Sequence, residues 1–289
     1  MPILFNYPGY ESVANKLIES LNYQRGEVKF HNFPDGESLV TIKSDIKDRE
    51  VILLCGLDDP DSKIMSVIFF ANLAKELGAK KVGLIAPYLG YMRQDKRFEN
   101  GQAITSKIFA ELLSKQIDWL VTIDPHLHRY NSLSEIYSIK AQSLHSINAI
   151  SAWINNNIKN PLLIGPDAES EQWTANTAAI INAPFIILSK TRYGDKDVKV
   201  SMPEIDQFKN YTPIIIDDII STGRTMIETA QNLQKLGMQL PICIAVHALF
   251  AGNAYENLKK HFKIVVTCNT VTHISNAIDI SEIIADYLS

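Results

Sequence analysis

Two adjacent carboxylates, Asp217 and Asp218, follow the apolar run at residues 214–216 and precede a short loop of hydroxyl residues and glycine, Ser221–Thr225. Neighbouring carboxylates can accept hydrogen bonds from the vicinal hydroxyls of a ribose or from metal-bound water. The loop offers hydroxyls and backbone N–H groups at a helix N-terminus, where a phosphate is favoured. Gly223 lets the backbone approach a ligand closely. The segment predicts a sugar-phosphate site, although an acidic strand end followed by an ordinary Ser/Thr N-cap fits the same residues.

The segment Tyr91–Arg97 contains three cationic residues within a stretch of five, together with an amide and a carboxylate. Arginine presents a planar fork to phosphate oxygens, and lysine presents a mobile point charge. The segment therefore predicts contacts to a polyphosphate, with a solvated surface loop as the alternative.

Polar side chains close the predicted strand at residues 119–123. Because residues two apart at a strand end can point the same way, Asp124 with His126, or His126 with His128, could share a metal or a phosphate. A plain polar strand end fits equally well. Asp167, which follows a later predicted strand, is a further candidate ligand, since Mg²⁺ prefers oxygen and binds through one or two carboxylates plus substrate phosphate.

Lys190 and Arg192 lie in a polar, glycine-containing segment, residues 190–196, that follows another predicted strand. A loop that closes these cations over bound phosphates would stabilise charge in a transition state. Taken alone, the segment fits a plain surface loop as well.

Short apolar runs alternate with amphipathic stretches along the chain, which indicates βαβ units and mostly parallel sheets. In such sheets, ligands bind beyond the carboxyl ends of the strands. The predicted strands are residues 51–55, 81–86, 119–123, 161–164, 185–188, 214–216, 242–246 and 264–266. The predicted helices are residues 62–77, 104–115, 144–155, 171–181, 225–236 and 254–260.

The early region differs, because residues 28–33 and 38–42 predict two strands joined by a Pro-Asp-Gly turn. The helical stretch near residues 142–157 is predicted to cross between two α/β halves. Each half contains a strand that ends in an acidic loop, so the two folds are expected to be similar. The predicted domains are residues 1–143 and 144–289.

Composition places the chain among ordinary globular proteins. At 289 residues, two domains are expected, and 46% hydrophobic and 21% charged residues are typical values. The net charge of −4 and the lack of a Lys/Arg-rich run do not favour nucleic-acid binding. No apolar stretch approaches the length of about 18 residues that a membrane span needs.

The three cysteines, Cys55, Cys243 and Cys268, are widely separated and lie in or beside apolar runs. Buried free thiols are therefore expected, which fits a reducing cytoplasm. The first residues have neither a charged n-region nor a long h-region, so no signal peptide is predicted.

The segment Asp217–Thr225 resembles the phosphoribosyl pyrophosphate (PRPP) signature of type I phosphoribosyltransferases and of the related ribose-phosphate diphosphokinases, the PRPP synthetases. The resemblance to the diphosphokinases covers nearly the whole chain, since six motifs occur in their order and at close to their spacing. Phe33–Glu37 and Tyr91–Arg97 distinguish this family from the shorter phosphoribosyltransferases. The resemblance implies two similar phosphoribosyltransferase-like domains, each a mostly parallel sheet flanked by helices. The six motifs are Asp35-Gly36-Glu37, Arg93-Gln94-Asp95, Asp124-Pro125-His126, Gly165-Pro166-Asp167, Lys190-Thr191-Arg192 and Asp217–Thr225.

The resemblance implies an enzyme of nucleotide biosynthesis that transfers the diphosphoryl group of ATP to O1 of ribose 5-phosphate, giving PRPP and AMP. It also implies Mg²⁺ as cofactor and a cytoplasmic, dimer-based homo-oligomer that can reach a hexamer. No Walker A sequence is present, so ATP must be held differently from P-loop enzymes.

Roles carry over from the family residue by residue. The implied ATP-binding residues are Phe33, Asp35 and Glu37, in a turn donated by a neighbouring subunit, together with Arg93 and Gln94. The implied metal-linked pair is His126 and Asp167, and the implied catalytic cations are Lys190 and Arg192. The implied ribose 5-phosphate site comprises Asp217, Asp218, Ser221, Thr222, Gly223, Arg224 and Thr225.

Three departures from the family pattern stand out. Glu169 and Glu171 replace small or basic residues in the diphosphate loop, where added negative charge should weaken polyphosphate binding unless it points away or helps to hold Mg²⁺. Ser221 stands where many members carry Asp, and Arg224 stands at a usual Gly position. These changes do not favour the phosphate-activated control found in many members.

Three other functions compete with an active diphosphokinase. A non-catalytic regulatory homologue would typically have lost the catalytic loop or the metal residues, whereas Lys190, Arg192, His126 and Asp167 are all present. A phosphoribosyltransferase would release diphosphate and need no ATP. A PRPP-sensing DNA-binding regulator is disfavoured by the acidic charge and by the lack of an extra N-terminal module.

Overall fold

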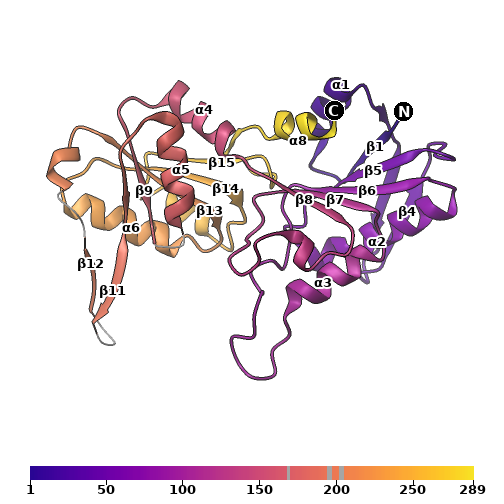
Figure 1. The fold of residues 1–289 in the computed structure, drawn as a ribbon, viewed down its shortest axis with the longest axis horizontal. Coiled ribbons are helices and arrows are strands. Elements are labelled where there is room, and N and C mark those ends of the chain that lie inside the picture. The colour runs from indigo at the N-terminus through magenta and orange to yellow at the C-terminus, as the bar shows by residue number, and fades with distance from the viewer. Residues whose placement is uncertain (168–169, 194–196, 202–204) are drawn as a thin grey trace. The chain divides into compact units, whose positions relative to one another are not determined.

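The chain forms two compact units, which Figure 1 shows as ribbons. The computed structural model describes residues 1–167, 170–193, 197–201 and 205–289, and it describes the side chains of all of these except residues 189–206. Unit 1 comprises Met1–His145 and Ile280–Ser289, and unit 2 comprises Ser146–Asp279. The division into domains at residues 143 and 144 stays a prediction.

Unit 1 is built on a six-stranded sheet in the order β2-β1-β5-β6-β7-β8, in which every neighbouring pair is parallel. Its strands are β1 (Ile3–Asn6), β2 (Gln24–Arg25), β5 (Glu50–Leu54), β6 (Lys81–Ala86), β7 (Trp119–Ile123) and β8 (Lys140–Leu144). The central strands are almost uniformly apolar because helices cover both faces of the sheet. All six strands therefore present their carboxyl ends at one edge.

The helices of unit 1 lie on the two faces of this sheet, with α1 and α8 on one face and α2 and α3 on the other (Figure 1). They are α1 (Glu11–Leu21), α2 (Pro60–Glu76), α3 (Thr105–Ser114), α8 (Ser281–Leu288) and the short 3₁₀ turn η1 (Leu133–Glu135). In the core, the buried rings of Phe5 and Phe70 meet edge to face at 5.2 Å. An antiparallel hairpin of β3 (Val28–Asn32) and β4 (Ser38–Ile42) confirms the two strands predicted early in the chain.

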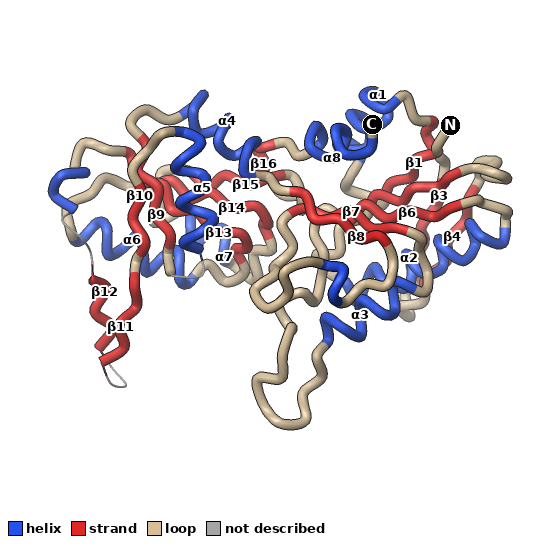
Figure 2. The backbone as a smooth tube through the Cα atoms, viewed as in Figure 1, coloured by secondary structure: helices blue, strands red, loops and turns tan. Residues whose placement is uncertain are grey.

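Unit 2 repeats this plan with a second six-stranded parallel sheet, in the order β10-β9-β13-β14-β15-β16. Its strands are β9 (Pro161–Gly165), β10 (Phe185–Ile187), β13 (Thr212–Ile220), β14 (Ile242–Ala248), β15 (Ile264–Cys268) and β16 (Asn276–Ile278). Its helices are α4 (Ile147–Asn157), α5 (Glu171–Ile181), α6 (Arg224–Lys235), α7 (Ala254–Leu258) and the 3₁₀ turn η3 (Ile205–Phe208). Two further strands, β11 (Ser189–Tyr193) and β12 (Asp197–Ser201), form an antiparallel ribbon (Figure 2).

The predicted α/β class with two similar parallel-sheet domains is confirmed, and several predicted elements coincide with observed ones, such as β6, β7 and α5. Two predicted bounds differ from the observed ones by three residues or more. Helix α4 begins at Ile147 rather than at residue 144, because Lys140–Leu144 pairs with β7 as an edge strand. Strand β13 does not end at residue 216 but continues to Ile220, because its ladder with β14 extends to the pair Ile220–Ala248.

The prediction for the cysteines is confirmed, since Cys55, Cys243 and Cys268 are all free and buried. Burial raises the pKa of the Cys55 thiol to about 12, which keeps it protonated and unreactive at neutral pH. Among the described residues, no helix is both long enough and apolar enough to cross a membrane.

The core of unit 1 generates a stability prediction. Phe70→Ala should destabilise the protein by about 3–5 kcal/mol, because the ring is fully buried and its loss leaves a cavity beside Phe5. The neighbouring Phe69, whose side chain is 40% exposed on the same helix, is the matched control. Phe69→Ala should cost about 1 kcal/mol or less. Equilibrium urea unfolding measures both, and equal losses would contradict the packing assigned to Phe70.

Candidate functional site

The polar residues of unit 2 that could bind a ligand follow two neighbouring parallel strands. Asp167 lies just after β9, and Asp217 and Asp218 lie within the last part of β13. Because β9 and β13 pair directly, their carboxyl ends meet at the same edge of the sheet. The negative charge of Asp167 is accordingly close enough to affect Asp217.

Asp217 is held in a strained electrostatic environment. Burial is the main cause that raises the pKa of its carboxyl well above the usual range, and the charges of Asp218 and Asp167 raise the pKa further. A backbone hydrogen bond lowers the pKa of Asp217 and offsets part of this rise, because the N–H of Asp218 donates to Asp217 Oδ1 at 3.0 Å. The N–H of Ile219 donates to Asp218 Oδ1 at 2.7 Å. Hydroxyl donors or a divalent cation at this edge would relieve the repulsion.

The loop after β13 leads directly into α6. Gly223 has a φ of +70°, a left-handed conformation that residues with a Cβ rarely adopt, and a Cβ there would also press within 3.2 Å of the Leu258 side chain. The N–H of Ala251 donates to Ser221 O at 3.0 Å and ties the start of the loop to the chain after β14. The predicted phosphate-binding residues Ser221, Thr222, Gly223, Arg224 and Thr225 therefore occupy a shaped turn at a helix N-terminus.

In unit 1, the segment with three cations forms a loop between β6 and α3. Arg93 and Gln94 are exposed, while the residues on either side of the pair, Met92 and Asp95, are buried. Tyr91 has a positive φ of 64°, and its hydroxyl bonds the Asp61 carboxylate at the start of α2. The exposed cations are thus carried on a loop whose base is fixed.

The loop after β7 brings His126 and His128 together, a pair that was predicted as able to share a metal or a phosphate. His126 Nδ1 and His128 Nε2 are 3.2 Å apart. Asp124 bonds His145, with 2.9 Å between Asp124 Oδ1 and His145 Nδ1, and adopts a positive φ of 35°. The pKa of His145 is raised mainly by this hydrogen bond. The sequence analysis did not single out His145, which follows a strand that it did not predict.

The turn at Phe33–Glu37 joins β3 to β4 and is exposed throughout. Its backbone is closed by bonds from the N–H of Phe33 to Glu37 O at 2.8 Å and from the N–H of Gly36 to Phe33 O at 2.9 Å. The N–H of Glu37 also donates to Asp35 Oδ1 at 3.2 Å. The three side chains assigned to ATP are presented on a rigid hairpin tip.

Lys190 and Arg192 do not lie in the loop that the sequence analysis expected. Both belong to β11, where they pair with Val200 and Val198 of β12. Valine, threonine and tyrosine in these two strands favour extended backbone, which accounts for the ribbon. The side chains of Lys190 and Arg192 lie outside the described part of the chain, as does Glu169. Glu171 is exposed in the first turn of α5.

Unit 2 carries side chains of the chemical type that a hard divalent cation takes as ligands. Asp167, Asp217 and Asp218 are carboxylates that repel one another, and Mg²⁺ takes such oxygen ligands. Asp167 Oδ1 also accepts a hydrogen bond from the N–H of Ser170 at 3.1 Å, which orients it. The paired imidazoles of His126 and His128 suit transition metals better than Mg²⁺.

The perturbed carboxylate generates a prediction. Because the folded protein disfavours charged Asp217, the group lowers stability as pH rises from the unfolded pKa near about 3.9 through the raised folded value. Asp217→Asn should therefore raise Tm in the absence of substrate, with a gain that grows as pH rises above about 4. The exposed Glu19→Gln is the control, with an effect within about 0.5 kcal/mol. A pH-independent difference would contradict the raised pKa.

Comparisons with family models match each unit to a known domain. A model described as the N-terminal domain of ribose phosphate pyrophosphokinase matches residues 3–116. A model of the phosphoribosyl transferase domain matches residues 132–282.

Full-length relatives agree with these matches. The ribose-phosphate pyrophosphokinase of Saccharolobus solfataricus is 34% identical over 287 residues, covering 95% of this chain and 97% of its own. The ribose-phosphate pyrophosphokinase of Methanobrevibacter smithii is 29% identical over 291 residues, which cover 96% of this chain and 97% of the relative. In fold, the chain is similar to the crystal structure of phosphoribosylpyrophosphate synthetase from Mycobacterium smegmatis, with a TM-score of 0.85 at 20% identity and coverage of 100% and 98%. The family predicted from the sequence is confirmed: this chain belongs to the ribose-phosphate pyrophosphokinase (PRPP synthetase) family of enzymes.

Proposed function

We propose that this protein is an active ribose-phosphate diphosphokinase that transfers the β,γ-diphosphoryl group of ATP to O1 of ribose 5-phosphate and releases PRPP and AMP. The observation that carries the proposal is the arrangement after β13. There, the adjacent carboxylates Asp217 and Asp218 are followed by the left-handed Gly223 and by the N-terminus of α6. This arrangement suits a ligand with vicinal hydroxyls at one end and a phosphate at the other.

On the ribose side, Asp217 and Asp218 would accept hydrogen bonds from the ribose hydroxyls. The 5-phosphate would lie on the N–H groups and hydroxyls of the turn that precedes α6, where the helix dipole favours negative charge. The exposed Arg224, at a usual glycine position of the family, would add a charged contact to that phosphate. The residues assigned to the turn are Ser221, Thr222, Gly223, Arg224 and Thr225.

On the nucleotide side, Arg93 and Gln94 would bind the ATP phosphates, and both are exposed on a loop fixed at its base. Phe33, Asp35 and Glu37 would hold the adenine from a neighbouring subunit. Their exposure on the hairpin tip supports a role toward a second chain. We therefore propose a dimer-based homo-oligomer, and the nucleotide-forming role of the family supports a cytoplasmic location.

Mg²⁺ is the proposed cofactor, with Asp167 and His126 as its assigned residues. The effect that the charges of Asp167 and Asp218 have on the pKa of Asp217 supports an oxygen-bound cation in unit 2. When bound, Mg²⁺ would neutralise charge on the diphosphate. His126 is tied to His128 by a 3.2 Å contact, which sets the orientation of its ring.

Lys190 and Arg192 are the proposed catalytic cations. Phosphoryl transfer depends on placing the reactants in line and on neutralising charge, and it needs little covalent chemistry from the protein. A lysine and an arginine near the transferred group would supply charge stabilisation, and separate sites for the two substrates would replace a random encounter by a positioned one.

The first test measures AMP and PRPP together after incubation of the protein with ATP, ribose 5-phosphate and Mg²⁺. The two products should form in equal amounts, and chelation of Mg²⁺ should abolish both. A non-catalytic homologue would form neither product. A phosphoribosyltransferase would consume PRPP and a base without ATP. Absence of AMP above background at varied Mg²⁺ and phosphate would refute the proposal.

The second test concerns Lys190. Lys190→Ala should lower kcat by about 10²-fold or more while KM for ribose 5-phosphate changes little, because the interaction is proposed to be made mainly in the transition state. Lys235→Ala, at an exposed position in the last turn of α6, is the control and should retain full kcat. A matched loss of kcat and of ribose 5-phosphate affinity would argue against the catalytic role.

A further inference from the structure

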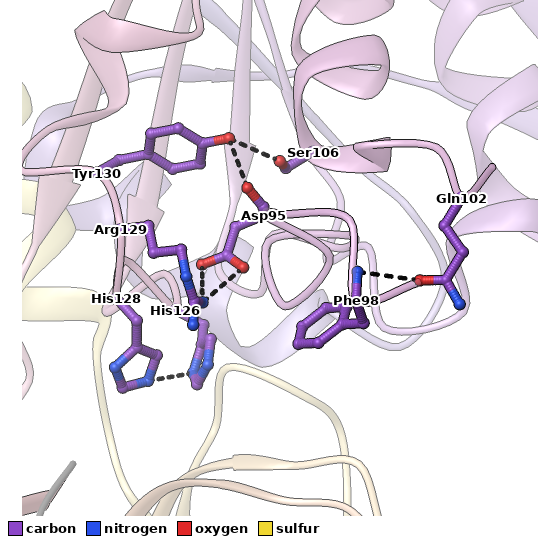
Figure 3. Close-up of polar contacts among 8 residues, drawn as sticks. All are labelled: Asp95, Phe98, Gln102, Ser106, His126, His128, Arg129 and Tyr130. Carbon is purple, nitrogen blue, oxygen red and sulfur yellow. Dashed lines mark hydrogen bonds and ion pairs between the residues drawn. The ribbon is translucent and has the colours of Figure 1, made fainter. Parts of the chain in front are cut away.

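A buried carboxylate lies in the loop between β6 and α3, which carries Arg93 and Gln94. The side chain of Asp95 is 1% exposed, although it follows the exposed pair Arg93 and Gln94. Both of its oxygens accept hydrogen bonds from Arg129 Nη1, at 2.8 and 3.0 Å (Figure 3). A buried carboxylate is costly unless it is paired in this way, so Arg129 is what allows Asp95 to face inward.

The main chain around Asp95 is held by the same neighbourhood. Tyr130, the residue after Arg129, donates its hydroxyl hydrogen bond to Asp95 O at 3.3 Å, and its hydroxyl also lies 3.2 Å from Ser106 Oγ (Figure 3). On the other side, the N–H of Ser106 donates to Gln94 O at 3.2 Å. The backbone that carries the exposed side chain of Gln94 is thereby fixed from two directions.

The outer part of the loop is held differently. Gln102 Oε1 accepts hydrogen bonds from the N–H groups of Phe98 and Glu99, both at 3.2 Å, so this part closes upon itself. The contacts of Asp95 with Arg129 and Tyr130 tie this loop to the loop after β7. The same loop carries His126, three residues before Arg129, and His128, which immediately precedes Arg129.

We propose that the Asp95–Arg129 ion pair is a positioning device for nucleotide binding, which holds Arg93 and Gln94 in register with the loop that carries His126. This inference rests on the proposed function, because it assigns Arg93 and Gln94 to the ATP phosphates. Neither Asp95 nor Arg129 needs to touch the substrate. The pair acts by reducing the freedom of side chains that do, so that less order has to be imposed when ATP binds.

A purely structural ion pair makes a different prediction. An ion pair that only stabilised unit 1 would lower stability when broken and would alter both substrates equally. A positioning pair should affect ATP selectively, because the residues assigned to ribose 5-phosphate belong to unit 2. The ratio of the two KM values therefore separates the two roles.

The experiment compares Asp95→Asn, Arg129→Gln and Arg129→Lys in the full-length protein. We expect KM for ATP to rise about tenfold in the first two variants and less in Arg129→Lys, which keeps the charge and one donor. KM for ribose 5-phosphate should stay within about twofold. The double variant Asp95→Asn/Arg129→Gln should match the single variants, because residues that act as one unit are not additive. Glu111→Gln, which breaks the exposed Glu111–Lys115 pair of α3, is the matched control and should change neither KM.

The outcomes distinguish this inference from the proposed function. Equal rises in both KM values, or no rise in either, would overturn the positioning role. If Asp95→Asn does not fold, the two variants at the half-exposed Arg129 decide the question. If the wild-type protein makes no AMP, the proposed function fails, and the dissociation constant for ATP measured by calorimetry replaces KM. An unchanged dissociation constant in Arg129→Gln would then overturn the inference.

Discussion

Parallel strand pairing is the constraint on which the rest of this structure depends. In both six-stranded sheets every neighbouring pair is parallel, so each strand must be followed by a crossover, and all carboxyl ends collect at one edge. The strands themselves are apolar because helices cover both faces. Within the two sheets, the candidate functional residues therefore follow or end the strands, such as Asp124 after β7, Asp167 after β9 and Asp217 in the last part of β13.

This concentration of polar groups has an electrostatic cost. Asp217 is half-buried and lies near Asp218 and Asp167, and desolvation together with these charges raises its pKa. An arrangement selected only for stability would not place these carboxylates side by side, since like charges at a buried site oppose folding. The same repulsion favours the binding of hydroxyl donors or a divalent cation. Unit 2 thus gives up stability at the position where its proposed ligand would restore it.

In unit 1, the structure instead holds the polar side chains of an exposed loop in place. Arg93 and Gln94 are presented to solvent, yet the neighbouring residues are anchored by Tyr91 to Asp61 and by Asp95 to Arg129. Long cationic side chains lose much rotamer entropy when they are ordered. Anchoring the backbone beside them reduces the part of this cost that falls on ligand binding.

The sequence by itself determined the α/β class, the strands β6 and β7, helix α5 and the family, because these depend on local periodicity and on motifs contiguous in the chain. The tertiary structure alone decided which distant residues meet. It placed α8 in unit 1 beside α1, made Lys140–Leu144 an edge strand, and brought His145 within hydrogen-bond distance of Asp124. It also paired Asp95 with Arg129, across 34 residues. The physical reason is that such partners are chosen by packing and by the need to neutralise buried charge, and neither leaves a periodic signal in the chain.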